Sequence, residues 1–138
     1  MKLEEFENFI ILDETPELLL GNIYEAIYLV NNNNNNEFTF IDEMYGDPYC
    51  GIICTDNNYC IIGGHCLLLW VDGESIRFED LKDIYDIRKV SDNEYEILTD
   101  PWSENSSIWI FNVMNKSFIK LRDFDKYRNT EYTNDVIW

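Results

Sequence analysis

The sequence predicts an α+β fold built mainly of antiparallel β-strands. Short runs of β-branched and aromatic residues alternate with Asn, Asp, Ser, Gly and Pro, which is typical of strands joined by tight turns. The 138 residues are 46% hydrophobic and 15% aromatic, and this is enough apolar surface to offset the chain entropy of folding. We therefore expect a single domain that spans residues 1–138.

The clearest strands are expected in the second half of the chain, where β-prone runs are bounded by turn residues. They are residues 94–99, 107–113 and 117–121. Residues 65–71 are mainly apolar, which indicates a buried strand. Asp72 and Gly73 predict a tight turn from this strand into a partner strand at residues 75–78.

Two stretches of the chain resemble each other, which predicts a duplicated unit. Ile23-Tyr24-Glu25 begins a stretch that is echoed from Ile84-Tyr85-Asp86 onward. Both stretches continue as short apolar segments separated by turn residues. Residues 23–62 and residues 84–122 are therefore each expected to form a four-stranded meander.

Residues 15–30 fit either a helix or strands. Thr15 is a suitable N-cap and Pro16 a suitable first helical residue, whereas Gly21 disfavours a helix. The compromise is a helical turn that feeds a strand in each copy. Further short helices are expected at residues 2–9 and 78–85.

Two polar segments are expected to be irregular. The asparagine run at residues 31–36 has low complexity and predicts an exposed loop. Residues 123–134 are polar and also predict a loop, while residues 136–138 are apolar enough to dock onto the body of the protein.

Charge is the main functional signal. Ten Lys and Arg stand against 27 Asp and Glu, a formal charge of −17, which disfavours binding to nucleic acid or to an anionic membrane. Residues 1–76 hold fourteen acids and one base, Lys2, while residues 77–138 hold thirteen acids and nine bases. If residues 1–76 form one face or one end of the fold, their negative charge attracts a cationic partner. The alternative is that the acids only keep the protein soluble.

The cellular compartment is predicted from the N-terminus and the longest apolar run. The first residues are acidic and lack the pattern of a signal peptide. The longest apolar run, residues 61–71, is far shorter than the roughly 20 residues of a membrane helix. We therefore expect a cytoplasmic protein with no membrane partner and with reduced thiols.

Cys50, Cys54, Cys60, Cys66 and His65 are the one cluster of soft metal ligands. Their spacing, C-x3-C-x5-C-x5-C, lacks the paired knuckles of structural zinc sites. In a strand, Cys50 and Cys54 lie about 13 Å apart, too far to share an ion. Adjacent His65 and Cys66 point to opposite faces, which does not suit a nucleophile and its base. We expect core cysteines, a satisfied polar His65 and no cofactor; zinc and a Cys60–His65 pair are the alternatives.

Two matching loops, at Tyr45-x-Asp47 and Trp102-x-Glu104, carry an aromatic residue two positions before an acid. The sequence contains no calcium-loop or nucleotide-binding motif. Aromatic anchors beside acids suit the recognition of a basic protein. With the acids that precede the first loop, the candidate partner-binding residues are Asp42, Glu43, Tyr45, Asp47, Trp102 and Glu104. The alternative is that the aromatic residues cap the core at strand ends.

A compact, acidic, aromatic-rich single domain without a catalytic constellation resembles the immunity proteins that bacteria encode beside secreted polymorphic or contact-dependent toxins. The resemblance covers the size and charge of the whole chain, and no family motif carries residues over. It implies a non-enzymatic protein that occludes the active site of a cationic toxin domain, often a nuclease. Two other classes stay open: a ligand-binding protein or enzyme with a pocket between the repeats, and an interaction module in an incomplete propeller-like array.

Overall fold

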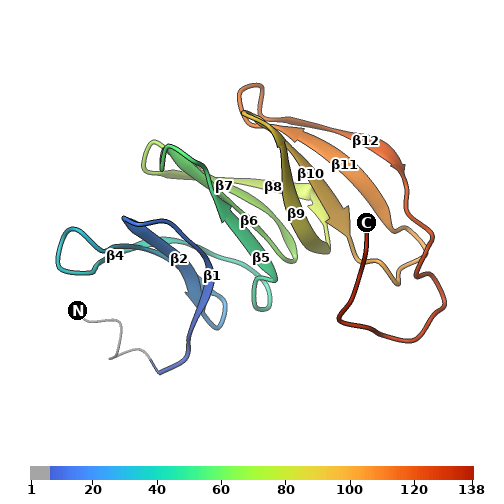
Figure 1. Ribbon diagram of the computed structural model, residues 1–138, viewed down its shortest axis with the longest axis horizontal. Coiled ribbons are helices and arrows are strands. Elements are labelled where there is room, and N and C mark those ends of the chain that lie inside the picture. The colour runs from blue at the N-terminus through green and yellow to red at the C-terminus, as the bar shows by residue number, and fades with distance from the viewer. Residues whose placement is uncertain (1–6) are drawn as a thin grey trace.

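The computed structural model describes residues 7–138, and these residues form an all-β fold (Figure 1). In this range, twelve antiparallel strands make three four-stranded sheets. The predicted predominance of antiparallel strands is confirmed. The helical alternative for residues 15–30 and the helix expected at residues 78–85 are wrong, because both segments are strands and turns. The strand alternative for residues 15–30 is confirmed. The helix expected at residues 2–9 falls largely outside the described residues. Residues 7–138 include no helical segment that could span a membrane.

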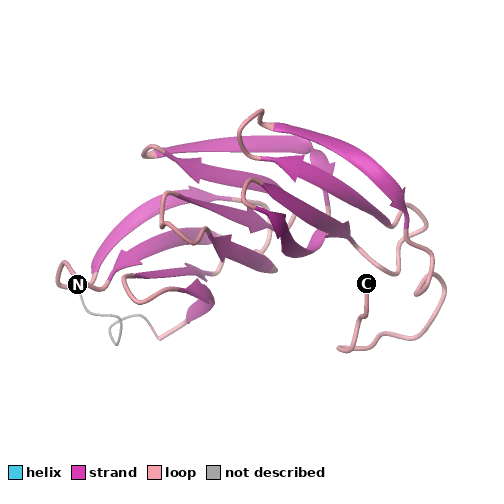
Figure 2. Cartoon of the chain, turned by 45° about the horizontal axis from the view of Figure 1, so that its top comes forward, coloured by secondary structure: helices cyan, strands magenta, loops and turns pink. Residues whose placement is uncertain are grey.

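Each sheet is an up-and-down meander, and the three sheets stack in an arc (Figures 1 and 2). The first sheet holds β1 (Phe9–Glu14), β2 (Leu18–Ile23), β3 (Ala26–Asn31) and β4 (Glu37–Glu43). The second holds β5 (Cys50–Ile53), β6 (Tyr59–Gly63), β7 (Cys66–Val71) and β8 (Glu74–Lys82). The third holds β9 (Ile84–Ser91), β10 (Glu94–Thr99), β11 (Ser107–Asn112) and β12 (Ser117–Asp123). The first strands β1, β5 and β9 are neighbours, an arrangement like that of propeller blades.

The repeat differs from the expected duplication in number and in phase. Residues 84–122 form the third sheet, a four-stranded meander as expected. Residues 23–62 are instead divided between the last two strands of the first sheet and the first two strands of the second. The resemblance matched residues 23–62 to the third sheet two strands out of phase, because every sheet consists of two similar hairpins. A match that is one hairpin out of phase therefore pairs strand with strand and turn with turn.

Strands β2 and β3 explain why the helical interpretation of residues 15–30 fails. Leu20 and Ile27 are buried toward the second sheet. Leu19 and Val30 pair across the ladder on the opposite face and are also buried. This alternation has a period of two, whereas a helix requires a single apolar stripe. Thr15 does accept a hydrogen bond from the N–H of Leu18, as an N-cap does, but here the bond closes the β1–β2 turn.

The helix expected at residues 78–85 is replaced by a crossing between sheets. Strand β8 ends at Lys82 and β9 begins at Ile84, so Asp83 alone connects the second sheet to the third. Asp83 adopts a left-handed φ of 55°, a conformation that Asp tolerates better than most residues. Leu81 and Ile84 on either side are fully buried in the core between the two sheets. Burial of both residues holds the sharp change of direction in place.

The second sheet is covered on both faces, which explains its continuous apolar sequence. Side chains of β6 and β7 alternate between two cores. Cys60, Ile62, Cys66 and Leu68 pack toward the first sheet, while Ile61, Leu67 and Leu69 pack toward the third. The predicted buried strand at residues 65–71 is confirmed as β7. The predicted tight turn is also confirmed, with positive φ at Asp72 and Gly73.

Residues 124–138 contain no strand and follow the third sheet as an extended segment (Figure 1). The N–H of Phe124 and the guanidinium of Arg128 both donate to the carbonyl of Ser106. The guanidinium carbon of Arg88 lies 3.9 Å from the ring centroid of Trp138. The predicted docking of residues 136–138 is therefore confirmed for Trp138. We call residues 124–138 the C-terminal segment.

Candidate functional site

One end of the array collects loops from all three sheets. In an antiparallel meander alternate connections lie at the same end. Four connections therefore share one end: the β4–β5 loop (44–49), the β6–β7 turn (64–65), Asp83 between β8 and β9, and the β10–β11 loop (100–106). Its aromatic and acidic side chains, which we call the loop-end surface, are Tyr45, Asp47, Tyr49, Asp83, Tyr85, Asp100, Trp102 and Tyr132.

Asp83 lies where three hollows of this end meet. Its backbone N–H donates to the carbonyl of His65 at 3.2 Å, and its carbonyl accepts from the N–H of Asp100 at 2.8 Å. The next residue, Ile84, donates to the carbonyl of Gly64 at 2.7 Å. These bonds tie the connection between the second and third sheets to the neighbouring turns. The loop-end surface is thus built on fixed backbone.

The hollow with aromatic walls is formed around Trp102 and measures about 300 Å³. Trp102 stacks on Tyr132 with ring centroids 4.9 Å apart, and it meets Tyr85 edge to face at 5.5 Å. Tyr49 forms a further wall, and Asp83 and Asp100 supply carboxylates. We call this hollow the aromatic pocket. It is open to solvent because Tyr49 and Tyr132 are 70% and 72% exposed.

The electrostatics of the aromatic pocket favour a cation. One carboxylate oxygen of Asp100 accepts from the backbone N–H of Trp102 at 3.0 Å. Among residues 7–138, no Lys or Arg forms a salt bridge with Asp83 or Asp100. Burial raises the pKa of the Tyr85 hydroxyl, and nearby Tyr132 and Asp86 raise it further, so this phenol is neutral at physiological pH.

A second hollow of about 310 Å³ adjoins the aromatic pocket through Tyr49 and Asp83. Tyr45 is 80% exposed and contacts the ring of His65 edge to face at 5.4 Å. Asp47 lines the same hollow. The backbone N–H of Gly46 donates to the Glu25 carboxylate at 3.2 Å, and this bond anchors the β4–β5 loop to the first sheet.

Four of the six predicted partner-binding residues lie in the two loops at this end. Tyr45 and Asp47 belong to the β4–β5 loop, and Trp102 and Glu104 to the β10–β11 loop. Trp102 forms the wall of the aromatic pocket, whereas Glu104 is exposed outside it. The shared end follows from the strand order.

Asp42 and Glu43 lie in β4 and join the first sheet to the second. The Asp42 carboxylate accepts from the Ser75 hydroxyl at 2.8 Å and from Arg77 at 3.3 Å. Arg77 also donates to the backbone carbonyl of Glu43 at 2.7 Å. The Asp42 carboxylate is therefore already paired with a cation in the folded chain.

The sequence did not single out the remaining members of the loop-end surface. They are Tyr49, Asp83, Tyr85, Asp100 and Tyr132. They come from four separate segments that only the tertiary fold brings together. The asymmetric charge and the Trp102 loop were the signals available, and neither identifies partners from other segments.

No family model matches the chain, and no curated protein sequence matches it.

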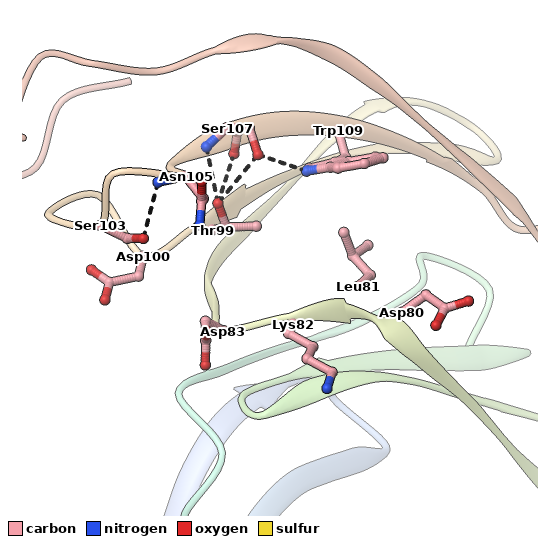
Figure 3. A pocket seen from close by; sticks show the side chains of 10 residues that line it. All are labelled: Asp80, Leu81, Lys82, Asp83, Thr99, Asp100, Ser103, Asn105, Ser107 and Trp109. Atoms are coloured by element: carbon pink, nitrogen blue, oxygen red, sulfur yellow. Dashed lines mark hydrogen bonds between the residues drawn. The ribbon is translucent and has the colours of Figure 1, made fainter.

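A cleft of about 300 Å³ lies between β8 and the strands β10 and β11 (Figure 3). Ser107 donates its backbone N–H to the Thr99 hydroxyl at 2.9 Å, and its own hydroxyl accepts from the Trp109 indole at 2.8 Å. These buried polar groups therefore bond mainly to one another. Asp83 and Asp100 line this cleft as well as the aromatic pocket. The charged side chains thus connect the two hollows.

The cysteines occupy the packed interior of the second sheet. Cys54, Cys60 and Cys66 are buried and Cys50 is half-buried. Burial raises the pKa of Cys60 to about 12, with Cys54 and Asp13 adding to the shift, so its thiol is protonated at neutral pH. No group of three metal-ligating side chains within residues 7–138 is arranged to hold a metal ion. The core role predicted for the cysteines agrees with their positions.

The acidic excess belongs mainly to the first sheet and to the second sheet as far as the start of β8. Residues 7–76 contain twelve acids and no Lys or Arg. Among the described residues, only the Arg77–Asp42 pair brings a base of the second half onto one of these acids. The acids lie at both ends of the array, as Asp47 and Asp72 illustrate. The excess negative charge of this half is therefore largely uncompensated by ion pairing.

Proposed function

We propose that this protein binds a basic surface of another protein and that the loop-end surface makes the contact. The observation that carries the proposal is the set of exposed aromatic rings interspersed with carboxylates that have no salt-bridge partner among residues 7–138. Tyr and Trp are the side chains most often found at the energetic centre of protein interfaces. Carboxylates beside them select a positively charged partner.

The charge of the chain supports fast association. A formal charge of −17 creates a negative potential that accelerates encounter with a cationic protein. The effect is strongest where bases are scarce, and residues 7–76 have none. The loop-end surface includes the β4–β5 loop from this acid-rich half, so part of the contact lies within the segment that contributes most to steering.

The partner we propose is a cationic toxin domain, which makes the protein an immunity protein that acts by occlusion. A nuclease or similar toxin has a basic cleft that accommodates an anionic substrate. An acidic protein with aromatic anchors competes for that cleft. The antiparallel sheets hold the loops on hydrogen-bonded backbone, which lowers the entropy lost on binding.

The test is binding to the product encoded by the neighbouring reading frame, measured by biosensor kinetics. We expect this product to contain a basic domain, and its association rate to fall by about tenfold between 20 and 150 mM salt because screening shortens the steering field. An association rate that does not change with salt, or a neighbour without any basic domain that binds, contradicts the proposal.

A pair of double variants locates the contact. Asp47→Asn with Asp83→Asn removes two charges from the loop-end surface, and Asp56→Asn with Asp72→Asn removes two from the opposite end. We expect the first pair to raise Kd by more than about tenfold and the second by less than about threefold. Both pairs weaken the long-range attraction of the partner, but only the first removes charges that contact it. Equal losses would place the interface elsewhere.

A further inference from the structure

We propose that the aromatic pocket receives the guanidinium group of an arginine side chain from the partner. This inference rests on the proposed function and names the group that the loop-end surface recognises. The pocket has Tyr49, Tyr85, Trp102 and Tyr132 as walls, with Asp83 and Asp100 beside them. A cation in such a place gains from the faces of the rings and from the carboxylates together.

The size of the pocket suits a single side chain. Its volume of about 300 Å³ is at the lower limit for pockets that hold small-molecule ligands. Tyr49 and Tyr132 are exposed at its edge, while Trp102 is half-buried. A side chain that projects from a protein surface can therefore enter without displacing the core.

Arginine matches the pocket better than lysine does. One oxygen of Asp100 is occupied by the backbone N–H of Trp102. The other oxygen and the Asp83 carboxylate have no hydrogen bond from the described residues, and they come from different segments. A guanidinium presents several N–H donors in one plane and stacks on aromatic rings. An ammonium is a compact, strongly hydrated point charge that gains less from flat walls.

The chain already holds one guanidinium in this way. Arg88 lies over the Trp138 ring, with 3.9 Å between the guanidinium carbon and the ring centroid. Its Nε donates to the Glu96 carboxylate at 3.1 Å. An aromatic face and a carboxylate thus bind the same arginine within this fold. The aromatic pocket offers the same two kinds of group to an arginine from outside.

The experiment titrates the full-length, ¹⁵N-labelled protein with the capped tripeptide Gly-Arg-Gly and follows the indole N–H resonances. We expect a saturable shift of the Trp102 signal and no shift of Trp70, which packs against the core between the first two sheets. The peptide with citrulline in place of arginine is expected not to bind, since it keeps the shape and loses the charge. The lysine peptide is expected to bind about fivefold more weakly.

Asp83→Asn and Asp72→Asn form a matched pair for this test. Both residues are exposed, both have positive φ, at 55° and 54°, and both substitutions remove one charge. We expect Asp83→Asn to raise the Kd of the arginine peptide by about fivefold or more, and Asp72→Asn by less than about twofold. Tyr132→Ala is expected to weaken binding as well, because it removes the ring stacked on Trp102.

The inference is overturned if the citrulline or lysine peptide binds as tightly as the arginine peptide, or if the two Asp variants behave alike. Its failure is distinct from failure of the proposed function. Partner binding without arginine-peptide binding removes only the assignment of the pocket. Arginine-peptide binding without any association with a basic neighbour removes the proposed function.

Discussion

The backbone N–H of Asp100 donates a 2.8 Å hydrogen bond to the carbonyl of Asp83, and this bond joins the β10–β11 loop to the connection between the second and third sheets. Two acidic residues that are far apart in sequence are thereby held at one edge of the aromatic pocket. Neither forms a salt bridge with a base of the described chain. A protein that maximised only its own stability has no reason to place like charges together here.

Replacing Asp83 by Asn should therefore leave the fold intact and weaken only binding. Asn tolerates the left-handed φ of 55° at least as well as Asp, and the substitution removes a like charge near Asp100. We expect the free energy of unfolding to stay within about 0.5 kcal/mol of the parent or to rise slightly. Chemical denaturation at low salt measures this. A loss above about 1 kcal/mol would show that the charge supports the fold.

The hydroxyl pair of Tyr59 and Tyr95 predicts an asymmetric response to two similar substitutions. The two oxygens are 2.9 Å apart, and the Tyr59 hydroxyl also lies 3.1 Å from the carbonyl of Asp92. Tyr95 is fully buried. Tyr59→Phe leaves the Tyr95 hydroxyl buried without its partner and should cost about 1–3 kcal/mol. Tyr95→Phe leaves Tyr59 with an acceptor and should cost about 1 kcal/mol. Urea unfolding of both variants tests the order, and the reverse order would contradict it.

Buried thiols and phenols predict a loss of stability at alkaline pH. The pKa of Cys60 is raised from 9.0 to about 12 by burial, and burial also raises the pKa of Tyr95. Above pH 9 the unfolded chain releases the Cys60 proton while the folded chain retains it. The stability from Cys60 is thus complete below pH 9 and is lost as pH rises toward 12, with a slope approaching about 1.4 kcal/mol per pH unit.

The measurement is the free energy of unfolding from pH 7 to 10.5 in the presence of a reductant. Cys60→Ala removes one of the groups that titrate only on unfolding, so its stability should fall less steeply above pH 9 than that of the parent protein. Identical slopes for the two proteins would show that Cys60 does not take part in this linkage.

Local patterns predicted strand β7 and the turn that follows it because the signals for these two features are local. The apolar run that becomes β7 and the Asp72-Gly73 turn each depend on residues adjacent in sequence. The helical alternative at residues 15–30 arose because Thr15 accepts the same kind of hydrogen bond in a β-turn as at a helix start. Only the packing of Leu20 and Val30 on opposite faces of the first sheet decides between a helix and strands, and this packing depends on residues distant in sequence.

The candidate site was predictable only in part. Trp102 stands two residues before an acid, and this local pattern marked its loop. Tyr85 and Tyr132, which contact the same indole, are 17 residues before it and 30 after it in the chain. Their contact with Trp102 depends on the one-residue connection at Asp83 and on the course of the C-terminal segment. Neither feature has a sequence signature of its own.

The close approach of the second and third sheets predicts a steric cost at Gly63. A Cβ there would lie 2.4 Å from Ile84 Cγ2 and 2.8 Å from Ile84 Cβ, next to Asp83. Gly63→Ala should therefore cost about 1–3 kcal/mol by overpacking. Gly51→Ala is the control, because its closest contact, at 2.8 Å, is a terminal methyl group of the Leu20 side chain, and it should cost less. Thermal unfolding compares the two, and equal costs would argue against a tighter fit at Gly63.

Trp138 should hold the C-terminal segment and, through it, one wall of the aromatic pocket. Its ring lies against Arg88, and its indole N–H donates to the Asp86 carboxylate at 3.1 Å. Trp138→Ala removes both contacts and should cost about 1–3 kcal/mol for release of the segment. Trypsin should then cut faster after the basic residues of the segment, Lys126 and Arg128. Ile137→Ala is the control, since Ile137 is exposed and should leave the cutting rate unchanged. If both variants are cut at the parental rate, other contacts hold the segment, the 2.8 Å bond from Arg128 to Ser106 first among them.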